Sequence, residues 1–484
     1  MSKARRLHPI ASVINTVKRA KRLVIPILAI LFSGGRDSAG SLLYAMLASA
    51  VIVIFTFISG LLSWYRYTYK MEPDELRIEY GIFVRKKRFI PYERIQSIDV
   101  TEGILQRLFG LVKVQIETAG GQQDEGADAV LSAITKEEAQ IIQEFVATAK
   151  GNRRVEGLEE QGHPSVYHIS RQQLIMLSLT SGGVGVVISA VFAVLSQLDD
   201  FIPFKKLFGG FETWAERNLI IIAIIVFFVF LISWMIALVG TLLKYANFTV
   251  IKAEKDLLIS QGLLERRQIT IPIKRIQAVK IRENIIRQIF GYATVHVESA
   301  GGSVENLEGA NVTILPMIKL NQIASVLDTL LPEYCMTTSF TPVPKRALRR
   351  YIFRSWSWVV PIAALAIIFL KLWGLLSLLL LVIVTFRAIL KYRAAGWKLD
   401  GQQLSLRYRT TQRITVLIKK NKLQSLELRE SPFQHKVQLC TIEAFVESGA
   451  GNAGGTVVDM EKNDSLKVYE WFTREQKNRD SSEE

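Results

Sequence analysis

Few residues of this chain have types and spacings that could do chemistry. The histidines follow no metal-ligand spacing, and none accompanies a recurring serine, cysteine or carboxylate as a nucleophile and base would. They are His8, His163, His168, His296 and His435. Cys335 and Cys440 lie too far apart in the sequence to indicate a disulfide framework or a thiolate metal site. We therefore predict no catalytic residue, no metal and no cofactor, and expect a protein that is not an enzyme.

Two Ala-Gly-Gly runs, at 119–121 and 300–302, are the nearest approach to a phosphate-binding loop. Each follows a predicted strand, but neither leads into the lysine and hydroxyl residue of a P-loop or the glycine spacing of a dinucleotide site. No helix is expected to open directly after them. We interpret both runs as turns at strand ends.

Clustered cations are more informative, because the formal net charge is +16. A cation beside an anionic leaflet gains roughly 1 kcal/mol, so we predict lipid-facing residues where cations recur in an internal repeat. These candidates are Arg85, Lys86, Lys87, Arg88, Arg266 and Arg267. The alternative is a solvated strand edge whose charges prevent aggregation. Nucleic acid is not an expected partner, since much of the positive charge flanks apolar segments and is explained by membrane topology.

Long apolar segments predict membrane-spanning helices, which need about 20 residues each. The segments are 42–63, 174–198, 219–243, 355–370 and 373–390. The stretch 23–32 is about half a span; we interpret it as a sixth helix, with an interfacial segment as the alternative. In chain order, counting 23–32 as the first helix, Lys and Arg gather before the first and fifth helices and after the second and sixth. The loops at the other ends of these helices hold few. This asymmetry predicts that both termini and all soluble domains are cytoplasmic.

An internal repeat gives the soluble parts their frame. Residues 76–121 align without a gap on 257–302 at an offset of 181, with 18 of 46 positions identical. A diverged third copy follows about 147 residues later, where Leu404, Arg413, Ile418, Gln424 and Glu430 match Leu257, Arg266, Ile271, Gln277 and Glu283. We predict structural roles for the recurring residues Gly81, Pro91, Arg94, Gln96, Glu117, Gly262, Pro272, Arg275, Gln277 and Glu298.

Within a copy the alternation of apolar and polar residues predicts strands, as in LRIEYGIF and RFIPYERIQSIDV. A short helical turn, ILQRLFG or IIRQIFG, precedes a further strand. Each copy ends in an amphipathic helix, at 136–149, 317–331 and 465–479. A twisted antiparallel sheet closed by a C-terminal helix is expected.

The glycine, Ile-Pro, Arg-Ile-Gln, Phe-Gly and Glu-[Ser/Thr]-Ala-Gly-Gly frame after a helical hairpin resembles bacterial pleckstrin-homology (PH)-like membrane proteins of the bPH2 type. The likeness is strong in the first two copies, and the third has lost the proline and the Phe-Gly pair. It implies a PH-like fold and a bacterial cell membrane location. It also implies an association of some relatives with resistance to antimicrobial peptides or bacteriocins, and a smaller one-domain relative as a companion.

We therefore expect an α+β membrane protein with about six transmembrane helices in three hairpins, each followed by a PH-like β-sheet domain with a C-terminal helix. The expected order is a basic N-terminus with a first hairpin (1–66), domain 1 (67–150), a linker (151–171), a second hairpin (172–245), domain 2 (246–333), a basic linker (334–354), a third hairpin (355–392) and the diverged domain 3 (393–484).

Two functions from different classes fit this organisation. The first is a scaffold or envelope-defence protein that contacts anionic inner-leaflet lipid or a partner membrane protein, either the one-domain relative or a second copy of itself. The second is an exporter or transporter component that moves a peptide or lipid. Membrane segments with almost no central ionisable residue disfavour transport, because substrate pathways usually need such residues.

Overall fold

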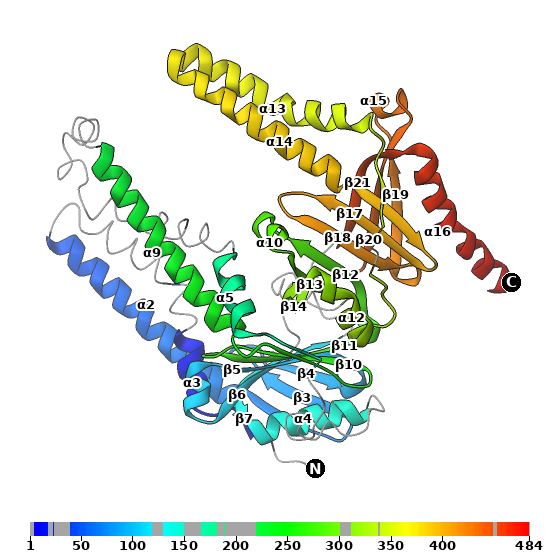
Figure 1. Cartoon of the computed structure of the whole chain (residues 1–484). Helices are drawn as coiled ribbons and strands as arrows, with labels where there is room; N and C mark the ends of the chain where they lie inside the picture. The colour runs from blue at the N-terminus through cyan, green and yellow to red at the C-terminus, as the bar shows by residue number, and fades with distance from the viewer. Residues whose placement is uncertain are drawn as a thin grey trace. The chain divides into compact units, whose positions relative to one another are not determined.

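In the computed structural model, the described residues are 4–17, 23, 39–118, 129–149, 166–181, 189, 219–300, 311–336, 339–448 and 453–483. They form an α+β structure of antiparallel sheets and long apolar helices (Figure 1). The chain divides into two compact units. Unit 1 comprises Met1–Gly121, Ala127–Ile251 and Leu258–Thr270, and unit 2 comprises Gln122–Gly126, Lys252–Leu257 and Ile271–Glu484. The second repeat therefore contributes its first strands to unit 1 and its last strands to unit 2.

Among the described residues, four helices are long and apolar enough to cross a membrane. They are α2 (Ala39–Arg66), α9 (Leu219–Tyr245), α13 (Ala347–Leu370) and α14 (Ser377–Ala394). The short 3-10 helix η5 (Lys371–Leu376) joins α13 to α14, which run back along each other (Figure 1). This confirms the predicted third hairpin.

The other two predicted hairpins are described only in part. The predicted helix at 23–32 lies outside the described residues apart from Leu23. The predicted helix at 174–198 is described at its start, where α5 (Arg171–Leu179) lies beside α9 and the hydroxyl oxygens of Ser181 and Thr241 are 3.0 Å apart. The prediction of six helices in three hairpins is thus confirmed for four helices and one hairpin.

Unit 1 contains two sheets. The first has the order β1-β2-β3-β4, and the second has the order β7-β6-β5-β11-β10-β9-β8. The strands of the first are β1 (Arg5–Arg6), β2 (Thr68–Met71), β3 (Glu75–Tyr80) and β4 (Lys86–Pro91). Those of the second are β5 (Ile95–Glu102), β6 (Leu111–Thr118), β7 (Ala129–Thr135), β8 (Tyr167–His168), β9 (Thr249–Lys252), β10 (Asp256–Gln261) and β11 (Arg266–Pro272).

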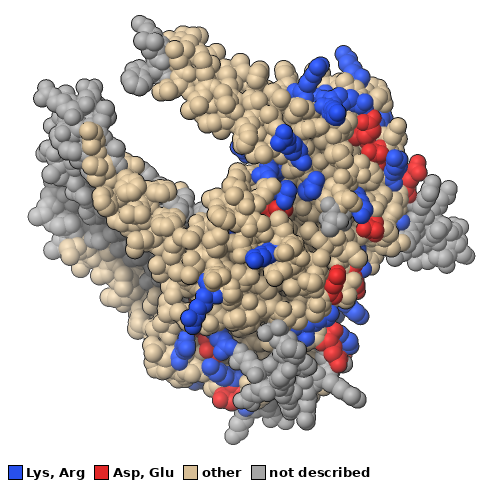
Figure 2. All heavy atoms as spheres, in the orientation of Figure 1, with Lys and Arg blue, Asp and Glu red and all other residues tan. Residues whose placement is uncertain are grey.

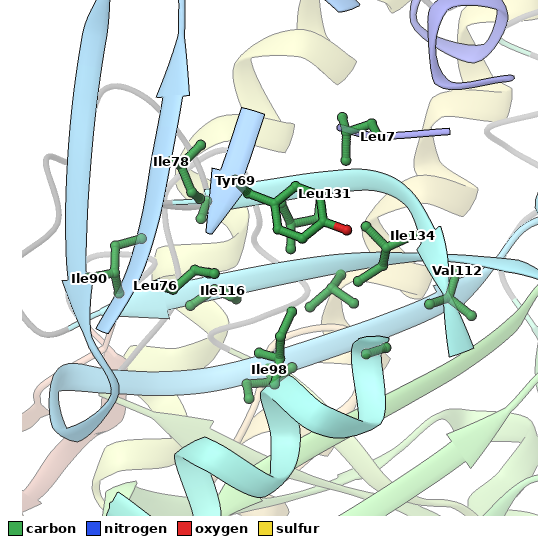
Figure 3. Close-up of a cluster of buried hydrophobic side chains, with 14 of the residues drawn as sticks. Leu7, Tyr69, Leu76, Ile78, Ile90, Ile98, Val112, Ile116, Leu131 and Ile134 are labelled. Atoms are coloured by element: carbon green, nitrogen blue, oxygen red, sulfur yellow. The ribbon is translucent and has the colours of Figure 1, made fainter. Parts of the chain in front are cut away.

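Alternating apolar residues of these strands make the core of unit 1. Leu76 and Ile78 of β3 lie near Ile116 and Leu131 of β6 and β7 (Figure 3), and all four are almost fully buried. The helix α4 (Lys136–Ala149) has the predicted bounds and buries one face in this cluster. This is the expected sheet closed by a C-terminal helix.

Unit 2 repeats the arrangement, with one sheet of order β14-β13-β12-β18-β17-β16-β15 and another of order β19-β20-β21. The strands of the larger sheet are β12 (Ile276–Glu283), β13 (Tyr292–Ser299), β14 (Asn311–Lys319), β15 (Thr341–Pro342), β16 (Gly396–Asp400), β17 (Gln403–Arg409) and β18 (Arg413–Lys419). The smaller sheet contains β19 (Leu423–Arg429), β20 (Leu439–Val446) and β21 (Ala453–Glu461). The helices α12 (Leu320–Leu330) and α16 (Lys462–Glu483) end the second and third repeats.

Two predicted strands were too long. The segment LRIEYGIF leaves the sheet after Tyr80, because Gly81 adopts a φ of +113° and turns the chain. The segment RFIPYERIQSIDV is divided into β4 and β5 by a 3-10 helix, η1 (Tyr92–Arg94). Pro91 ends β4, and the φ that its ring fixes suits the residue before η1. The predicted helix at 317–331 begins later, at Leu320, because its first residues complete β14.

Candidate functional site

Each described membrane helix that precedes a repeat runs almost directly into a strand. Tyr67 alone separates α2 from β2, and Ala395 alone separates α14 from β16. Residues 246–248 separate α9 from β9. Connections this short leave a sheet no room to move away from the end of its helix. Each of these sheets therefore begins at the end of a candidate membrane helix.

The turn between the second and third strands of a repeat lies against the same helix end. In the first repeat, Arg66 at the end of α2 donates from Nη1 to the backbone oxygen of Ile82 at 2.8 Å. In the second, the backbone N–H of Gly262 donates to Ala246 O at 2.8 Å and that of Leu263 to Leu243 O at 3.0 Å. We call residues 81–84 and 262–265 the helix-base turns.

Glycine is required at the start of both helix-base turns. Gly81 and Gly262 have φ values of +113° and +104°. A Cβ would lie 2.0 Å from Val84 O at the first and 1.9 Å from Glu265 O at the second. The recurrence of this glycine therefore has a conformational cause: only glycine folds the chain so tightly.

Apolar side chains project from the helix-base turns. Phe83 is 95% exposed and Val84 is 72% exposed, while Leu263 and Leu264 are about half exposed. Exposed apolar residues beside the end of a membrane helix are typical of segments that enter the lipid headgroup region. The sequence pattern did not indicate this surface, because the segment that ends at Phe83 was expected to be a strand.

Three short helices also carry exposed apolar side chains: α3 (Ile104–Leu108) in unit 1, and α10 (Ile285–Ile289) and α15 (Pro432–His435) in unit 2. Their exposed apolar residues, with those directly following, are Ile104, Leu105, Leu108, Phe109, Ile285, Ile286, Ile289, Phe290, Phe433 and Val437. Arg107 of α3 donates to Leu263 O at 3.0 Å, which places α3 beside a helix-base turn. Arg350 of α13 donates to Phe433 O at 2.8 Å, which places α15 beside a membrane helix.

The predicted lipid-facing cations of the first repeat occupy the start of β4. The side chain of Arg85 is 65% exposed and forms an ion pair with Glu79, and Lys87 lies 3.7 Å from the same carboxylate. Burial raises the pKa of Glu79, but the charges of Arg85 and Lys87 outweigh burial and the net pKa is lowered. Lys86 and Lys87 are exposed. Their contact with lipid stays a prediction.

Cations in the same part of the second and third repeats have contacts within their own units. Arg267 forms an ion pair with Asp99 of β5 at 2.6 Å, and only 23% of its side chain is exposed. Arg407 donates to Ala394 O at 3.0 Å, at the end of α14. Arg413 forms an ion pair with Glu283, which is 4% exposed. These residues therefore make structural contacts within the protein, besides any contact with lipid.

The third repeat departs from the first two at its turn. Residues 410–412 are Thr-Thr-Gln, without the glycine and the apolar pair. Thr411 still lies beside a membrane helix, since its hydroxyl is 3.5 Å from a guanidinium nitrogen of Arg387 in α14. Exposed apolar side chains are therefore a feature of the first two turns.

The other recurring residues lie inside the sheets. Ile95 and Ile276 are buried, and Gln277 donates to Arg275 O at 3.1 Å. Pro272 precedes the 3-10 helix η3 (Ile273–Arg275), as Pro91 precedes η1, and Arg94 is the last residue of η1. Among the recurring glutamates, Glu117 accepts a hydrogen bond from Ser97 at 2.8 Å, and Glu298 forms an ion pair with Lys280 at 2.7 Å. Gln96 is the second residue of β5, after Ile95.

A buried carboxylate that the sequence analysis missed joins a membrane helix to the third repeat. Asp459 of β21 is fully buried and accepts from Arg350 at 3.0 Å and from Arg354 at 2.9 Å. Gln434 donates to it at 2.8 Å. The sequence analysis attributed the two arginines to the charge that orients the third hairpin. Their spacing of four residues, on one face of α13, was the signal for a shared partner.

The charge distribution separates the membrane part from the rest. Figure 2 shows Lys and Arg over the β-sheet parts, whereas the visible faces of α13 and α14 carry almost none near their far ends. No group of three His, Cys, Asp or Glu side chains suited to a metal ion occurs among the described residues. The geometry thus offers, in each unit, exposed apolar residues and cations near the ends of apolar helices.

Comparison with known proteins agrees with this geometry. The bacterial PH domain family matches residues 23–150, 189–334 and 357–476. The chain belongs to this family. It is also 39% identical to the UPF0699 transmembrane protein YdbT of Bacillus subtilis (strain 168), over 98% of this chain and 99% of that protein. No solved structure shows significant similarity to this chain. The chain is thus a transmembrane protein with repeated bacterial PH domains.

Proposed function

We propose that this protein is a non-enzymatic scaffold of the bacterial cell membrane, whose PH-like repeats contact the anionic cytoplasmic leaflet. The observation that carries the proposal is the position of the helix-base turns. A hydrogen bond from the Arg66 side chain holds the first at the end of α2, and backbone hydrogen bonds hold the second at the end of α9. Their apolar side chains are exposed there. An apolar turn at this depth gains free energy by entering the headgroup region.

Cations next to the first helix-base turn support the choice of leaflet. Arg66 ends α2, and Arg85 begins the basic run that follows the turn. At the other end of the third hairpin, the turn between α13 and α14 contains only Lys371 as a charged residue. Positive charge on one side favours the cytoplasmic side for that end of each helix. Each cation near the anionic surface adds roughly 1 kcal/mol of attraction.

The experiment places an environment-sensitive fluorophore on the first helix-base turn of the full-length protein in anionic liposomes. Phe83→Cys carries the probe in a Cys335→Ser background, since Cys335 is the exposed native cysteine. Lys467→Cys is the matched control, because that side chain is 67% exposed on α16. We expect lipids with quenching groups to quench the probe at 83 but not at 467. Equal quenching by an aqueous reagent at both positions would refute the lipid contact.

The same variants test the orientation. In intact cells, a thiol reagent that cannot cross the membrane should leave both cysteines unmodified until the cells are permeabilised. Modification of position 467 in intact cells would show that the third repeat faces outward, contrary to the proposal.

The resemblance to bacterial PH-like proteins extends the proposal to envelope defence against antimicrobial peptides. A strain that lacks the gene should become more sensitive to such peptides, and the full chain should restore resistance. The double variant Phe83→Ser, Val84→Ser should restore less, if the scaffold acts through lipid contact. Restored resistance with unchanged lipid contact but measurable peptide efflux would favour the exporter instead.

A further inference from the structure

Neighbouring repeats are joined by strand pairing, each pair within one unit. In unit 1, β11 of the second repeat pairs antiparallel with β5 of the first. In unit 2, β18 of the third repeat pairs antiparallel with β12 of the second. Each junction extends a sheet from the third strand of one repeat to the fourth strand of the repeat before it.

The two junctions have the same register. Arg266 lies opposite Glu102 in the first, and Arg413 lies opposite Glu283 in the second. The two arginines are equivalent in the repeat, at an offset of 147, and the two glutamates are equivalent at an offset of 181. Two independent pairings that agree residue by residue define one interface that the chain uses twice.

Side chains at the two junctions also correspond. In the first, Arg107 of α3 donates to Leu263 O in the turn before β11. In the second, Gln288 of α10, which is equivalent to Arg107, accepts from Arg409 beside the turn before β18. The short helix of one repeat thus contacts the turn of the next repeat at both junctions.

Of the strands equivalent to those that form the two junctions, one third strand and one fourth strand lie at the end of a sheet. β4 is the equivalent of β11 and β18, and β19 is the equivalent of β5 and β12. Among the described residues, β4 pairs with β3 at one end of its sheet and β19 pairs with β20 at one end of its own. Most side chains of β19 are exposed, whereas those of β12 are mostly buried by its pairing with β18.

Two of the three charged pairs between β4 and β19, with the residues that flank these strands, are complementary in the register of the two junctions. The arginine recurs in all three repeats and so does the glutamate; Arg85 and Glu430 are the members that no junction uses. With Arg85 opposite Glu430, Arg88 falls opposite Glu427. Lys86 falls opposite Arg429, a like-charged pair, but Arg429 forms ion pairs with Glu427 and Glu443. Charged residues directly opposite each other stabilise a strand pair when their signs differ.

We propose that β19 of one molecule pairs with β4 of a second copy of this chain, antiparallel and with Arg85 opposite Glu430. The contact joins different surfaces of the two copies, so it builds a ring or an open chain of molecules at the membrane. The backbone hydrogen bonds of an added strand supply affinity, and the opposed charges supply register. This inference goes beyond the proposed function and does not depend on lipid contact.

The present partners of the two residues do not oppose the pairing. Arg85 contacts Glu79, and Glu430 contacts Lys462 and His435, in ion pairs whose side chains are partly or largely exposed to solvent. Exposed ion pairs contribute little stability, so exchanging or sharing them costs little. Contact with a short helix also leaves a helix-base turn exposed. In the second repeat, the backbone oxygen of Leu263 accepts a hydrogen bond from Arg107 of α3, and Leu263 is still 48% exposed.

Disulfide crosslinking in native membranes tests the pairing and its register. Two differently tagged full-length chains are co-expressed in the Cys335→Ser background, one with Lys87→Cys and the other with Leu428→Cys. The proposed register puts these residues opposite each other, at a Cα separation that a disulfide can bridge. The matched control replaces Leu428→Cys by Gln424→Cys, on the same strand but four residues out of register.

We expect a crosslinked heterodimer with position 428 and at least tenfold less with position 424. Arg85→Glu should lower the yield several-fold, as should Glu430→Arg in the other chain, and the two together should restore it. Three results would overturn the proposal: no crosslink at 428, equal crosslinks at 428 and 424, or a bridge that forms only within a single chain carrying both cysteines.

Discussion

At the scale of single residues, the recurring glycine of the first two repeats is set by the backbone conformation that the turn needs. A glycine at 81 and 262 is required because the chain turns there with positive φ and no space for a Cβ. Glu298 shows the limit: its recurrence indicated a partner, but the structure places Lys280 there, and Lys280 does not recur. An amino-acid pattern reveals which positions are constrained, while the partner depends on which strands become neighbours.

His296 makes the stability of unit 2 depend on pH. It lies on β13, which pairs with β12 and β14, and its Nδ1 is 3.1 Å from the hydroxyl of Thr313. Burial, followed by the charges of Arg282, Arg287 and Lys280, lowers its pKa from 6.5 to about 3. Below pH 6.5 the unfolded chain therefore binds a proton that the folded chain excludes, so the free energy of unfolding falls as the pH falls toward 3.

Replacing the ring should remove that dependence. For His296→Gln in detergent, we expect a shallower loss of stability between pH 6.5 and pH 4 than in the native protein, by on the order of 1 kcal/mol per pH unit. Chemical unfolding followed at several pH values measures this slope. Identical slopes for both proteins would show that His296 is protonated in the folded state as readily as in the unfolded state.

At the scale of elements, the periodicity of the sequence predicted most helices and strands. α4 has the predicted bounds, and α13 and α14 form the predicted hairpin. The junctions between repeats were not predicted, because an alternating pattern specifies the faces of a strand and says nothing of its edges. β11 follows the same pattern whether it pairs with β5 or ends a sheet. The apolar helix-base turns were missed for a related reason: an apolar run at a strand end has the same pattern in a core or at a membrane.

Asp459 is the element-scale contact that we expect to matter most for stability. It ties α13 to β21 through Arg350 and Arg354, and it is fully buried. Removing one partner of a buried ion pair costs about 3–5 kcal/mol; the partial exposure of both arginines places Asp459→Ala at or below the lower end of that range. Thermal unfolding in detergent and protease cleavage between α14 and β16 measure the effect.

Arg354→Gln is the matched control for that prediction. Half of the Arg354 side chain is exposed, and Arg350 would still neutralise the carboxylate. We therefore expect a loss well below that of Asp459→Ala. Equal losses for the two variants would mean that the whole network, and not the buried charge, stabilises the connection between helix and sheet.

At the scale of the whole molecule, the repeat in the sequence and the folded unit have different boundaries. The second sheet of unit 1 takes β5, β6 and β7 from the first repeat and β8 to β11 from residues up to the middle of the second. A cut at the repeat boundary would expose the edge of β5 along its length, and long unpaired edges promote aggregation. A cut after β11 would leave that sheet complete, although it falls inside a repeat.

Two fragments distinguish these boundaries. We expect residues 1–272, which contain every strand of both unit 1 sheets, to purify in detergent as a monodisperse species with a cooperative unfolding transition. Residues 1–150, which end at the repeat boundary, should aggregate or unfold at a lower temperature, because β5 loses β11 and the ion pair between Asp99 and Arg267. If 1–150 were the more stable fragment, each repeat would fold on its own and strand pairing between repeats would be a weak later contact. The expected result is that fragment 1–272 is more stable than fragment 1–150. The shared sheet is then the folding unit, and the repeats are linked by the same kind of backbone hydrogen bonds that build their own sheets.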